Sequence, residues 1–201
     1  MTQADPVHYR DDGGTRKRVS TAKDDLFTFP DPLCAFCNNE RTQPHDLAWQ
    51  RLCAFLSARN PKPGSIFKPS TVFPQQPAQE MLNVHLFFIK MFGGLILEGS
   101  APLSIQPFAN AIVTGQSHSQ VYLKFGCGVT LDNNPVLNRT GLQTKVRSSA
   151  THERCTSAAW SYNVNGVSVT VMYSEQGMQS GMKWWHPRLT TDRVELVGIG
   201  E

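Results

Sequence analysis

Apolar residues in the middle of the chain recur at helical spacing. Between residues 45 and 58 they follow one another at steps of three and four, which places them on one face of a helix. The members of this set are Trp49, Leu52, Cys53 and Leu56. Pro44 precedes them, and proline suits a first helical turn because its missing N–H would have no partner there. We therefore predict a helix from about His45 to Ala58, ended by the Pro- and Gly-rich residues 60–64.

A second helix is predicted over about Ala78–Phe92. The pair Gly93-Gly94 follows, and we expect it to end the helix or to convert the chain to an extended Leu95–Leu97. Residues 65–80 are rich in proline and glutamine, which predicts an irregular path. Its expected anchors in the core are Phe67, Val72 and Phe73.

From about residue 108 onward, apolar and polar positions alternate, as they do in strands with one buried face. The clearest case is Trp160–Tyr173, with Asn165-Gly166 at its centre. Asn-Gly favours a two-residue hairpin loop, and all three apolar pairs then fall on one face, so turn and alternation predict the same register. These pairs are Val164 with Val167, Tyr162 with Val169, and Trp160 with Val171. Val194 and Leu196 predict a final strand.

The predicted fold class is therefore α+β. Residues 1–60 are expected to hold an N-terminal hairpin and the first helix, and residues 65–201 the second helix and an antiparallel β-sheet. The hairpin is predicted from Val7–Arg10 and Thr15–Ser20, because Gly13-Gly14 between them supplies the backbone freedom of a tight turn.

Composition excludes several classes of protein. Apolar residues make up 40% of the chain and charged residues 17%, unlike the high-charge composition of disordered proteins. The net charge of +3 is too small to require a nucleic-acid or anionic-membrane partner. Polar residues and the glycine pair interrupt the longest apolar stretch, Met81–Leu97, so we predict a core element and no membrane partner. The polar N-terminus and the odd count of five cysteines favour a reducing, cytoplasmic location.

The pattern Cys34-x-x-Cys37 carries the most specific chemistry in the chain. Two thiolates at this spacing can bind one zinc ion, because the tight turn between them aims both sulfurs at one point. Redox pairs share the spacing, but the polar run 38–43 differs from the apolar helix start that usually follows a redox motif. Zinc is therefore the favoured interpretation, and residues 1–60 are expected to form a zinc-knuckle and helix segment.

Residues 33–46, which read LCAFCNNERTQPHD, resemble the second half of an HNH (His-Me finger) endonuclease module. The resemblance implies that Cys34 and Cys37 are half of a structural zinc site. It also implies that Asn38, or Asn39 one step on, helps to hold a catalytic divalent cation such as Mg²⁺. Such a module would contact DNA or RNA and hydrolyse a phosphodiester bond.

The resemblance also implies a histidine as general base upstream of the zinc motif, and His8 is the only candidate. Val7 precedes it where the family has an acidic residue, and no cysteine precedes Cys34 to supply a first CxxC. We therefore expect a divergent or truncated HNH-type protein that binds zinc and contacts nucleic acid. Its endonuclease activity would be reduced or absent.

Residues 183–188 place aromatic rings between cations, as surfaces that bind single-stranded nucleic acid do. The candidate nucleic-acid-binding residues are Lys183, Trp184, Trp185 and Arg188. The alternative interpretation, which we prefer for this stretch, is that the two tryptophans cap the core at an edge of the sheet.

Less specific features leave alternatives open. Cys53 lies on the apolar face of its predicted helix and is expected to be a core thiol. His45 could reach a metal or serve the first helical turn, and His85 and His118 are expected to be surface or satisfied core groups. The alternative function is a non-catalytic binding or scaffold protein whose C-terminal β region carries recognition. The sequence predicts neither the oligomeric state nor the nucleic-acid target.

Overall fold

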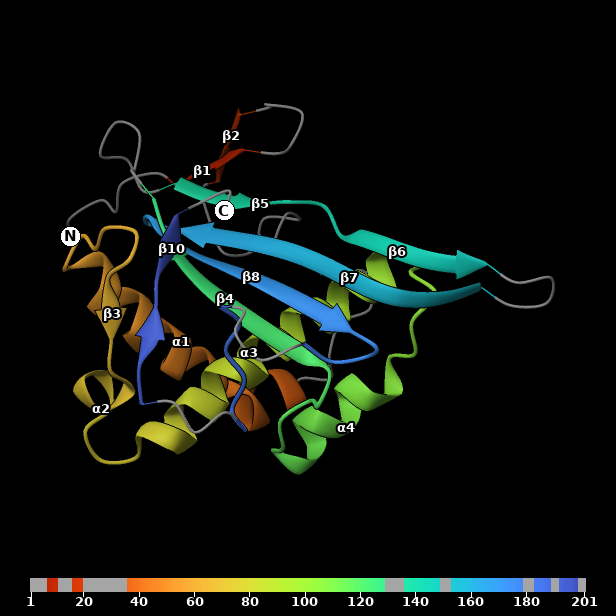
Figure 1. The fold of residues 1–201 in the computed structure, drawn as a ribbon, viewed down its shortest axis with the longest axis horizontal. Coiled ribbons are helices and arrows are strands. Elements are labelled where there is room, and N and C mark those ends of the chain that lie inside the picture. Colours follow the sequence, from red (N-terminus) through yellow and green to blue (C-terminus); the bar gives the residue numbers. More distant parts are fainter. Residues whose placement is uncertain are drawn as a thin grey trace.

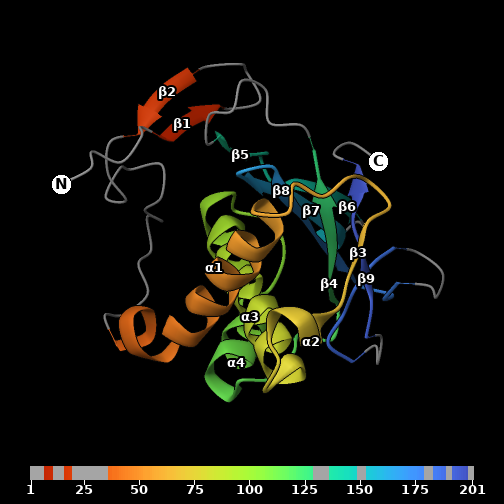
Figure 2. The ribbon, with the colours of Figure 1, turned by 90° about the vertical axis from the view of Figure 1, so that its left-hand side faces the viewer.

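The structure is a computed structural model of the chain. It describes residues 7–10, 16–19, 36–128, 136–148, 153–178, 183–188 and 192–198. Of residues 7–10, 16–19 and 136–139 it describes the backbone but not the side chains. The predicted α+β class is confirmed, because helices pack against one face of a mixed β-sheet (Figures 1 and 2).

Helix α1 (Gln43–Ser57) confirms the first predicted helix. Pro44 lies in its first turn, and all four residues of the predicted apolar face are buried. The ring of Trp49 packs edge-on against Phe88, with 4.8 Å between centroids, and lies 6.2 Å from the ring of Tyr162 in the sheet. The predicted face therefore joins the helix layer to the sheet.

Helix α3 (Pro77–Glu98) runs through the middle of the helix layer. The prediction that Gly93-Gly94 would end it or give an extended Leu95–Leu97 is wrong, because the helix continues to Glu98. A Cβ at position 93 would lie 3.2 Å from Ile105 Cδ1, so this glycine permits the close approach of a neighbouring helix. Tertiary packing here outweighs the low helix propensity of glycine.

The neighbour is helix α4 (Gln106–Thr114), which was not predicted. Strand-like alternation was expected from about residue 108, but Phe108 and Ala111 are buried at helical spacing. Pro107 lies in the first turn, and the helix ends at Gly115, whose φ of 66° is left-handed.

The predicted irregular segment contains two short elements. Strand β3 (Ile66–Phe67) pairs with β9 (Val194–Glu195), and helix α2 (Pro69–Val72) follows β3. The rings of Phe67 and Phe73 are buried, as predicted for anchors.

The larger sheet has the order β10-β4-β8-β7-β5-β1-β2, and β6 pairs with β7 outside this path. Its strands are β1 (Val7–Arg10), β2 (Arg16–Val19), β4 (Val121–Cys127), β5 (Val136–Arg139), β6 (Gln143–Ser148), β7 (Glu153–Val164), β8 (Val167–Ser174) and β10 (Val197–Gly198). Alternate residues of β4 and β8 are buried, which confirms the period-two pattern.

The central hairpin has the predicted register. The three predicted pairs along β7 and β8 all form. Asn165 and Gly166 have φ angles of 50° and 77°. Positive φ at both loop residues is the conformation that an Asn-Gly hairpin favours.

Two pairs of strands, one near each edge of the sheet, are parallel, whereas the predicted sheet was antiparallel. Strand β10 is parallel to β4, and β1 is parallel to β5. The predicted N-terminal hairpin forms, since β1 and β2 are antiparallel, and it extends the sheet of the C-terminal region. Sequence alternation fixes which face a strand buries but not the direction of a distant neighbour.

One hydrophobic core lies between the helices and the inner face of the sheet, and residues on both sides of the predicted boundary at 60–65 share it. Within the described part of the chain, α3 is the one helix that is long and apolar enough to cross a membrane by length and composition. In this structure it is the core helix, with Val84, Phe88 and Phe92 buried.

Candidate functional site

A single wide helical turn, Cys37–Arg41, leads directly into α1. The N–H of Thr42 donates to the carbonyl oxygen of Cys37 at 3.1 Å and closes the turn. Cys37 is half-buried, whereas the next four residues, Asn38 to Arg41, are exposed. The turn therefore presents a thiol and the two predicted metal-side carboxamides, Asn38 and Asn39, on one piece of surface.

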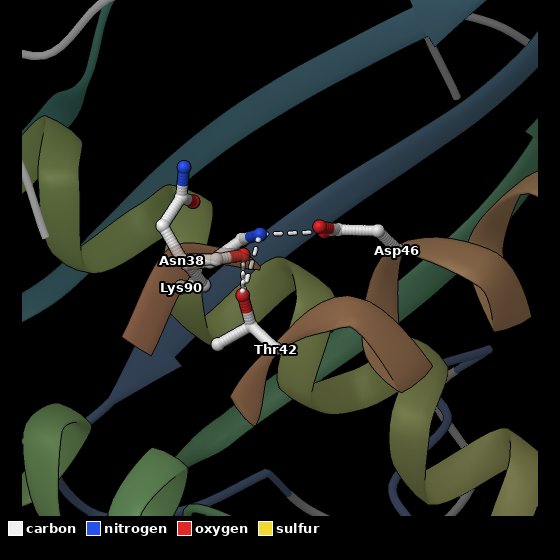
Figure 3. A network of polar contacts seen from close by, with 4 residues as sticks. All are labelled: Asn38, Thr42, Asp46 and Lys90. Carbon is white, nitrogen blue, oxygen red and sulfur yellow. Dashed lines mark hydrogen bonds and ion pairs between the residues drawn. The ribbon is translucent and has the colours of Figure 1, made fainter. Parts of the chain in front are cut away.

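Polar contacts fasten this turn to the core helix α3 (Figure 3). The ammonium group of Lys90 lies 2.5 Å from Asp46 Oδ1 and donates to Thr42 Oγ1 at 3.2 Å. The Thr42 hydroxyl donates to the carbonyl oxygen of Asn38 at 3.0 Å. Thr42 is fully buried, and the Lys90 side chain is 10% exposed. Largely buried polar contacts thus hold the exposed turn in place, and the sequence analysis did not identify them.

Among the described residues of this turn, Cys37 supplies a thiol that could bind zinc. Arg41 Nη1 lies 3.9 Å from its Sγ, and the Arg41 guanidinium lies 5.3 Å from the centre of the Phe36 ring. Cys34, the other predicted zinc ligand, lies outside the described residues. Across the residues that the structure does describe, no group of three His, Cys, Asp or Glu side chains is placed to hold a metal ion. A zinc site here would therefore need donors beyond the described residues.

His45 lies in the first turn of α1 and is buried. Burial, and to a smaller extent the positive charge of Lys90, lower its pKa to about 4, although Asp46 acts in the opposite direction. The ring is therefore neutral at pH 7. Its Nδ1 has no hydrogen-bond partner among the described residues.

The predicted general base, His8, lies in strand β1 opposite Arg18 of β2 and beside Val136 of β5. Its side chain is outside the described part of the structure. Figures 1 and 2 place β1 at one end of the molecule and the start of α1, which follows the turn Cys37–Arg41, at the other. The structure does not bring the strand of His8 to Asn38 and Asn39.

The predicted nucleic-acid segment forms the edge beside β4. Leu123 and Trp185 exchange backbone hydrogen bonds of 2.9 and 2.7 Å. The indole of Trp185 is buried, 7% exposed, and packs edge-on against Phe125 at 5.9 Å. This tryptophan is therefore part of the core, as the alternative interpretation predicted, and is not available to stack on a base.

The other candidate nucleic-acid-binding residues of this segment, Lys183, Trp184 and Arg188, are at least partly exposed. Trp184 is half-buried, and Lys124 Nζ lies 5.3 Å from the centre of its ring. Lys183 Nζ is 2.7 Å from Glu195 Oε1, and Arg188 is exposed. Trp184 and Lys124 together form a cation–aromatic pair that the sequence analysis did not find, because the two residues are distant in the chain.

The Trp184–Lys124 pair borders the outer face of the sheet, which points away from the helices. The register aligns Lys124 with Thr170 and Ser161 across three strands, and the Ser161 and Thr170 hydroxyls lie 3.1 Å apart. These side chains are half-buried. This row of the outer face is therefore polar, and the Trp184 ring and the Lys124 ammonium group lie at its border.

The three comparisons with known proteins give no relative. No model of a protein family matches the chain, and none of the curated proteins or solved structures matches it. The residues of the chain therefore carry the functional inference.

Proposed function

We propose that this chain is an HNH-type, cytoplasmic protein that binds zinc through Cys34 and Cys37 and contacts DNA or RNA. Its cleavage of nucleic acid, dependent on Mg²⁺ or a similar divalent cation, is reduced or absent. The observation that carries the proposal is the turn Cys37–Arg41. In this turn Asn38 and Asn39 are exposed, and Lys90 of α3 holds Thr42 at the end of the turn by a hydrogen bond. An exposed ligand on a fixed backbone is what a preorganised metal-binding residue needs.

The nucleic-acid contact is assigned to the Trp184–Lys124 pair and the exposed Arg188. A half-buried indole can stack on a base, and a nearby cation can meet the phosphate backbone. The polar row on the outer face of the sheet offers hydroxyl groups beside this pair.

Reduced or absent cleavage is supported by the arrangement of the candidate catalytic groups. A general base must come within hydrogen-bond reach of the water that it activates. The strand of His8 is at the far end of the molecule from the turn. The next histidine along the chain, His45, is buried.

Zinc content decides the first part of the proposal. Elemental analysis of the purified wild-type protein should find stoichiometric zinc, and both Cys34→Ser and Cys37→Ser should lose it. Cys53→Ala is the matched control, because Cys53 is a buried core thiol that contacts Ser57 and the Val164 carbonyl. Wild-type protein without zinc, or cysteine variants that keep it, would refute zinc binding.

Binding of a labelled single-stranded oligonucleotide tests the second part. Fluorescence polarisation should show affinity that falls with salt, as phosphate contacts require. Trp184→Ala should weaken binding by about 1–3 kcal/mol, the usual contribution of one stacked base. Lys124→Gln should reduce the salt dependence, whereas the exposed Lys68→Gln should change neither property. Binding that is absent, or that is unaffected by Trp184→Ala, contradicts this assignment.

Cleavage is tested separately, with a plasmid and a single-stranded substrate in the presence of Mg²⁺. We expect slow or undetectable cleavage. Any activity that is present should depend on Asn38 or Asn39 and should survive His8→Ala. Efficient cleavage that His8→Ala abolishes would show that the module is complete.

One observation favours a second function, that of a non-catalytic binding or scaffold protein. All six residues of β6 are exposed, and the described pairing of this strand is with β7 alone. Such an edge presents unpaired backbone groups to another chain. This function predicts a protein without zinc whose partner binding is lost when Val146→Pro removes a backbone donor from β6.

A further inference from the structure

Three histidines from separate parts of the chain meet inside the molecule, in a place that the proposed function does not use. His85 belongs to α3, His118 precedes β4, and His186 belongs to the edge segment 183–188. Their exposed fractions are 0%, 5% and 3%. The rings of His85 and His186 lie 5.3 Å apart, and His186 Nε2 is 3.0 Å from the carbonyl oxygen of His118.

Each of the three rings accepts a hydrogen bond from a backbone N–H. The N–H of His118 donates to His85 Nε2 at 3.2 Å, and the N–H of Gln120 donates to His118 Nδ1 at 3.2 Å. The N–H of Arg188 donates to His186 Nδ1 at 3.0 Å. A ring nitrogen that accepts is unprotonated, so all three imidazoles are neutral and each has one fixed tautomer.

A second proton on any of these rings would place an N–H against the backbone N–H that it now binds. The hydrogen bond would be lost, and a positive charge would stand in the interior. In the same direction, burial and the repulsion of the neighbouring rings lower the pKa of His85, and burial and repulsion by His186 lower the pKa of His118 to about 4. Burial also lowers the pKa of His186; the hydrogen bond to the His118 carbonyl oxygen acts in the opposite direction, and Arg188 lowers the pKa again, so the net shift is downward.

The other elements around the rings do not compensate such a charge. Helix α4 contributes the Phe108 ring, 4.4 Å from His118, and β4 contributes Tyr122, 5.2 Å from His186. Strand β8 contributes Tyr173, 6.2 Å from His118. The carboxylate beyond it, Glu175, is already paired with Arg154. Within the described part of the chain, the charge that acts on the cluster is therefore that of Arg188, which has the same sign as a protonated ring.

The cluster holds the segment 183–188 against the body of the protein. His186 and Trp185 contact His85 of α3, and the backbone of Trp185 pairs with Leu123 of β4. The neighbouring hairpin of β7 and β8 does not depend on these rings, because apolar residues such as Val169 and Val171 form its buried face.

We propose that His85, His118 and His186 form a pH-operated clasp that releases the segment 183–188 from the edge of β4 on acidification, while the hairpin of β7 and β8 stays folded. Release uncovers the backbone of Leu123 and the indole of Trp185. The edge of β4 is therefore closed at neutral pH and open in acid.

Hydrogen exchange measured residue by residue at several pH values between 7.5 and 4 tests the clasp. After correction for the intrinsic pH dependence of exchange, the amides of Leu123 and Trp185 should lose protection by at least about tenfold between pH 7.5 and about 5.5, one pH unit below the ordinary pKa of a histidine. The amides of Val169 and Val171 should keep theirs. Loss of protection at all four amides together, or at none of them, would overturn the proposal.

Two matched variants separate the clasp from a general effect of acid. His186→Gln keeps one acceptor and one donor but cannot be protonated, so release should move to lower pH. His45→Gln removes another buried histidine, in α1, that does not contact the segment, and release should stay at the wild-type pH. Equal shifts in both variants would contradict the proposal. If His186→Gln does not fold at pH 7.5, the wild-type exchange data alone decide.

Discussion

Lys90 and Asp46 form an ion pair of 2.5 Å that joins α3 to α1 across the base of the exposed turn. The Lys90 side chain is 10% exposed and Asp46 is 32% exposed, so the ammonium group has lost most of its contact with water. A charge held this far from solvent requires a partner, and here it has both Asp46 and the Thr42 hydroxyl. The pair therefore stabilises the geometry from which Cys37 and Asn38 reach the surface.

Lys90→Met should lower the free energy of unfolding by about 1–3 kcal/mol, because the Asp46 carboxylate and the Thr42 hydroxyl lose their shared donor. Urea denaturation at pH 7.5 measures the effect. Arg51→Met is the matched control, because Arg51 forms an ion pair of 3.4 Å with Glu80 but is 61% exposed. Exposed pairs contribute about 0–1 kcal/mol, so equal losses in the two variants would refute a stabilising role for Lys90.

The loop of the central hairpin gives a second prediction. Gly166 has a φ of 77°, a conformation that disfavours any side chain. Gly166→Ala should destabilise the protein by about 1 kcal/mol or more, whereas Asn165→Gly should be close to neutral because glycine adopts the φ of 50° at that position freely. Thermal unfolding of the two variants would contradict the assigned turn if Gly166→Ala were as stable as the wild type.

This hairpin and α1 could be predicted because their determinants are local. In the hairpin, Asn165-Gly166 sets the turn and the alternation of neighbouring residues sets the buried face. In α1, Pro44 and the spacing of Trp49 and Leu52 act within a few turns of one helix. Each prediction combined two independent features of one short segment, and both segments fold as expected.

Most of the features that escaped prediction depend on residues that are distant in the sequence. Helix α4 is the exception, because Pro107, the spacing of Phe108 and Ala111, and Gly115 are local signals of a helix. Helix α3 continues through Gly93 because α4 packs against it, and the direction of β10 is set by its approach to β4. In the sequence, Lys90 is only one of the polar residues that interrupt the apolar stretch Met81–Leu97, since its partner Asp46 is 44 residues away. The histidine cluster is drawn from α3, from the loop before β4 and from the edge segment in the same way. The spacing of residues along the chain does not show which distant residues come into contact in the fold.

The contact between α3 and α4 gives a third prediction. Glycine within a helix usually costs about 1 kcal/mol relative to alanine, so Gly94→Ala, at a half-buried position, should stabilise the protein. Gly93→Val should instead destabilise it, because its Cβ would lie 3.2 Å from Ile105 Cδ1 and 3.7 Å from Phe108 Cβ, before the added methyl groups are counted. Chemical denaturation compares the two, and a stabilised Gly93→Val would mean that α4 does not pack against this glycine.

His45 predicts how the stability of the protein depends on pH. Burial and the nearby charge of Lys90 lower its pKa from 6.5 to about 4 in the folded protein, so the unfolded chain binds this proton more readily than the folded one. The stabilising contribution of the neutral ring is therefore complete above pH 6.5 and is lost as the pH falls from 6.5 towards 4. The loss can reach about 3 kcal/mol, since one pKa unit corresponds to about 1.4 kcal/mol.

The comparison of wild type with His45→Gln isolates this contribution. Urea denaturation at pH 7.5, 6.5, 5.5 and 4.5 gives the free energy of unfolding of each protein, and the difference between the two curves removes the effect of other acid-sensitive groups. The variant should lose less stability than the wild type between pH 6.5 and 4.5. Because the slopes are compared rather than the absolute values, a constant cost of replacing the ring does not affect the result. Parallel curves would mean that the His45 ring titrates normally in the folded protein, and so is not buried in the first turn of α1.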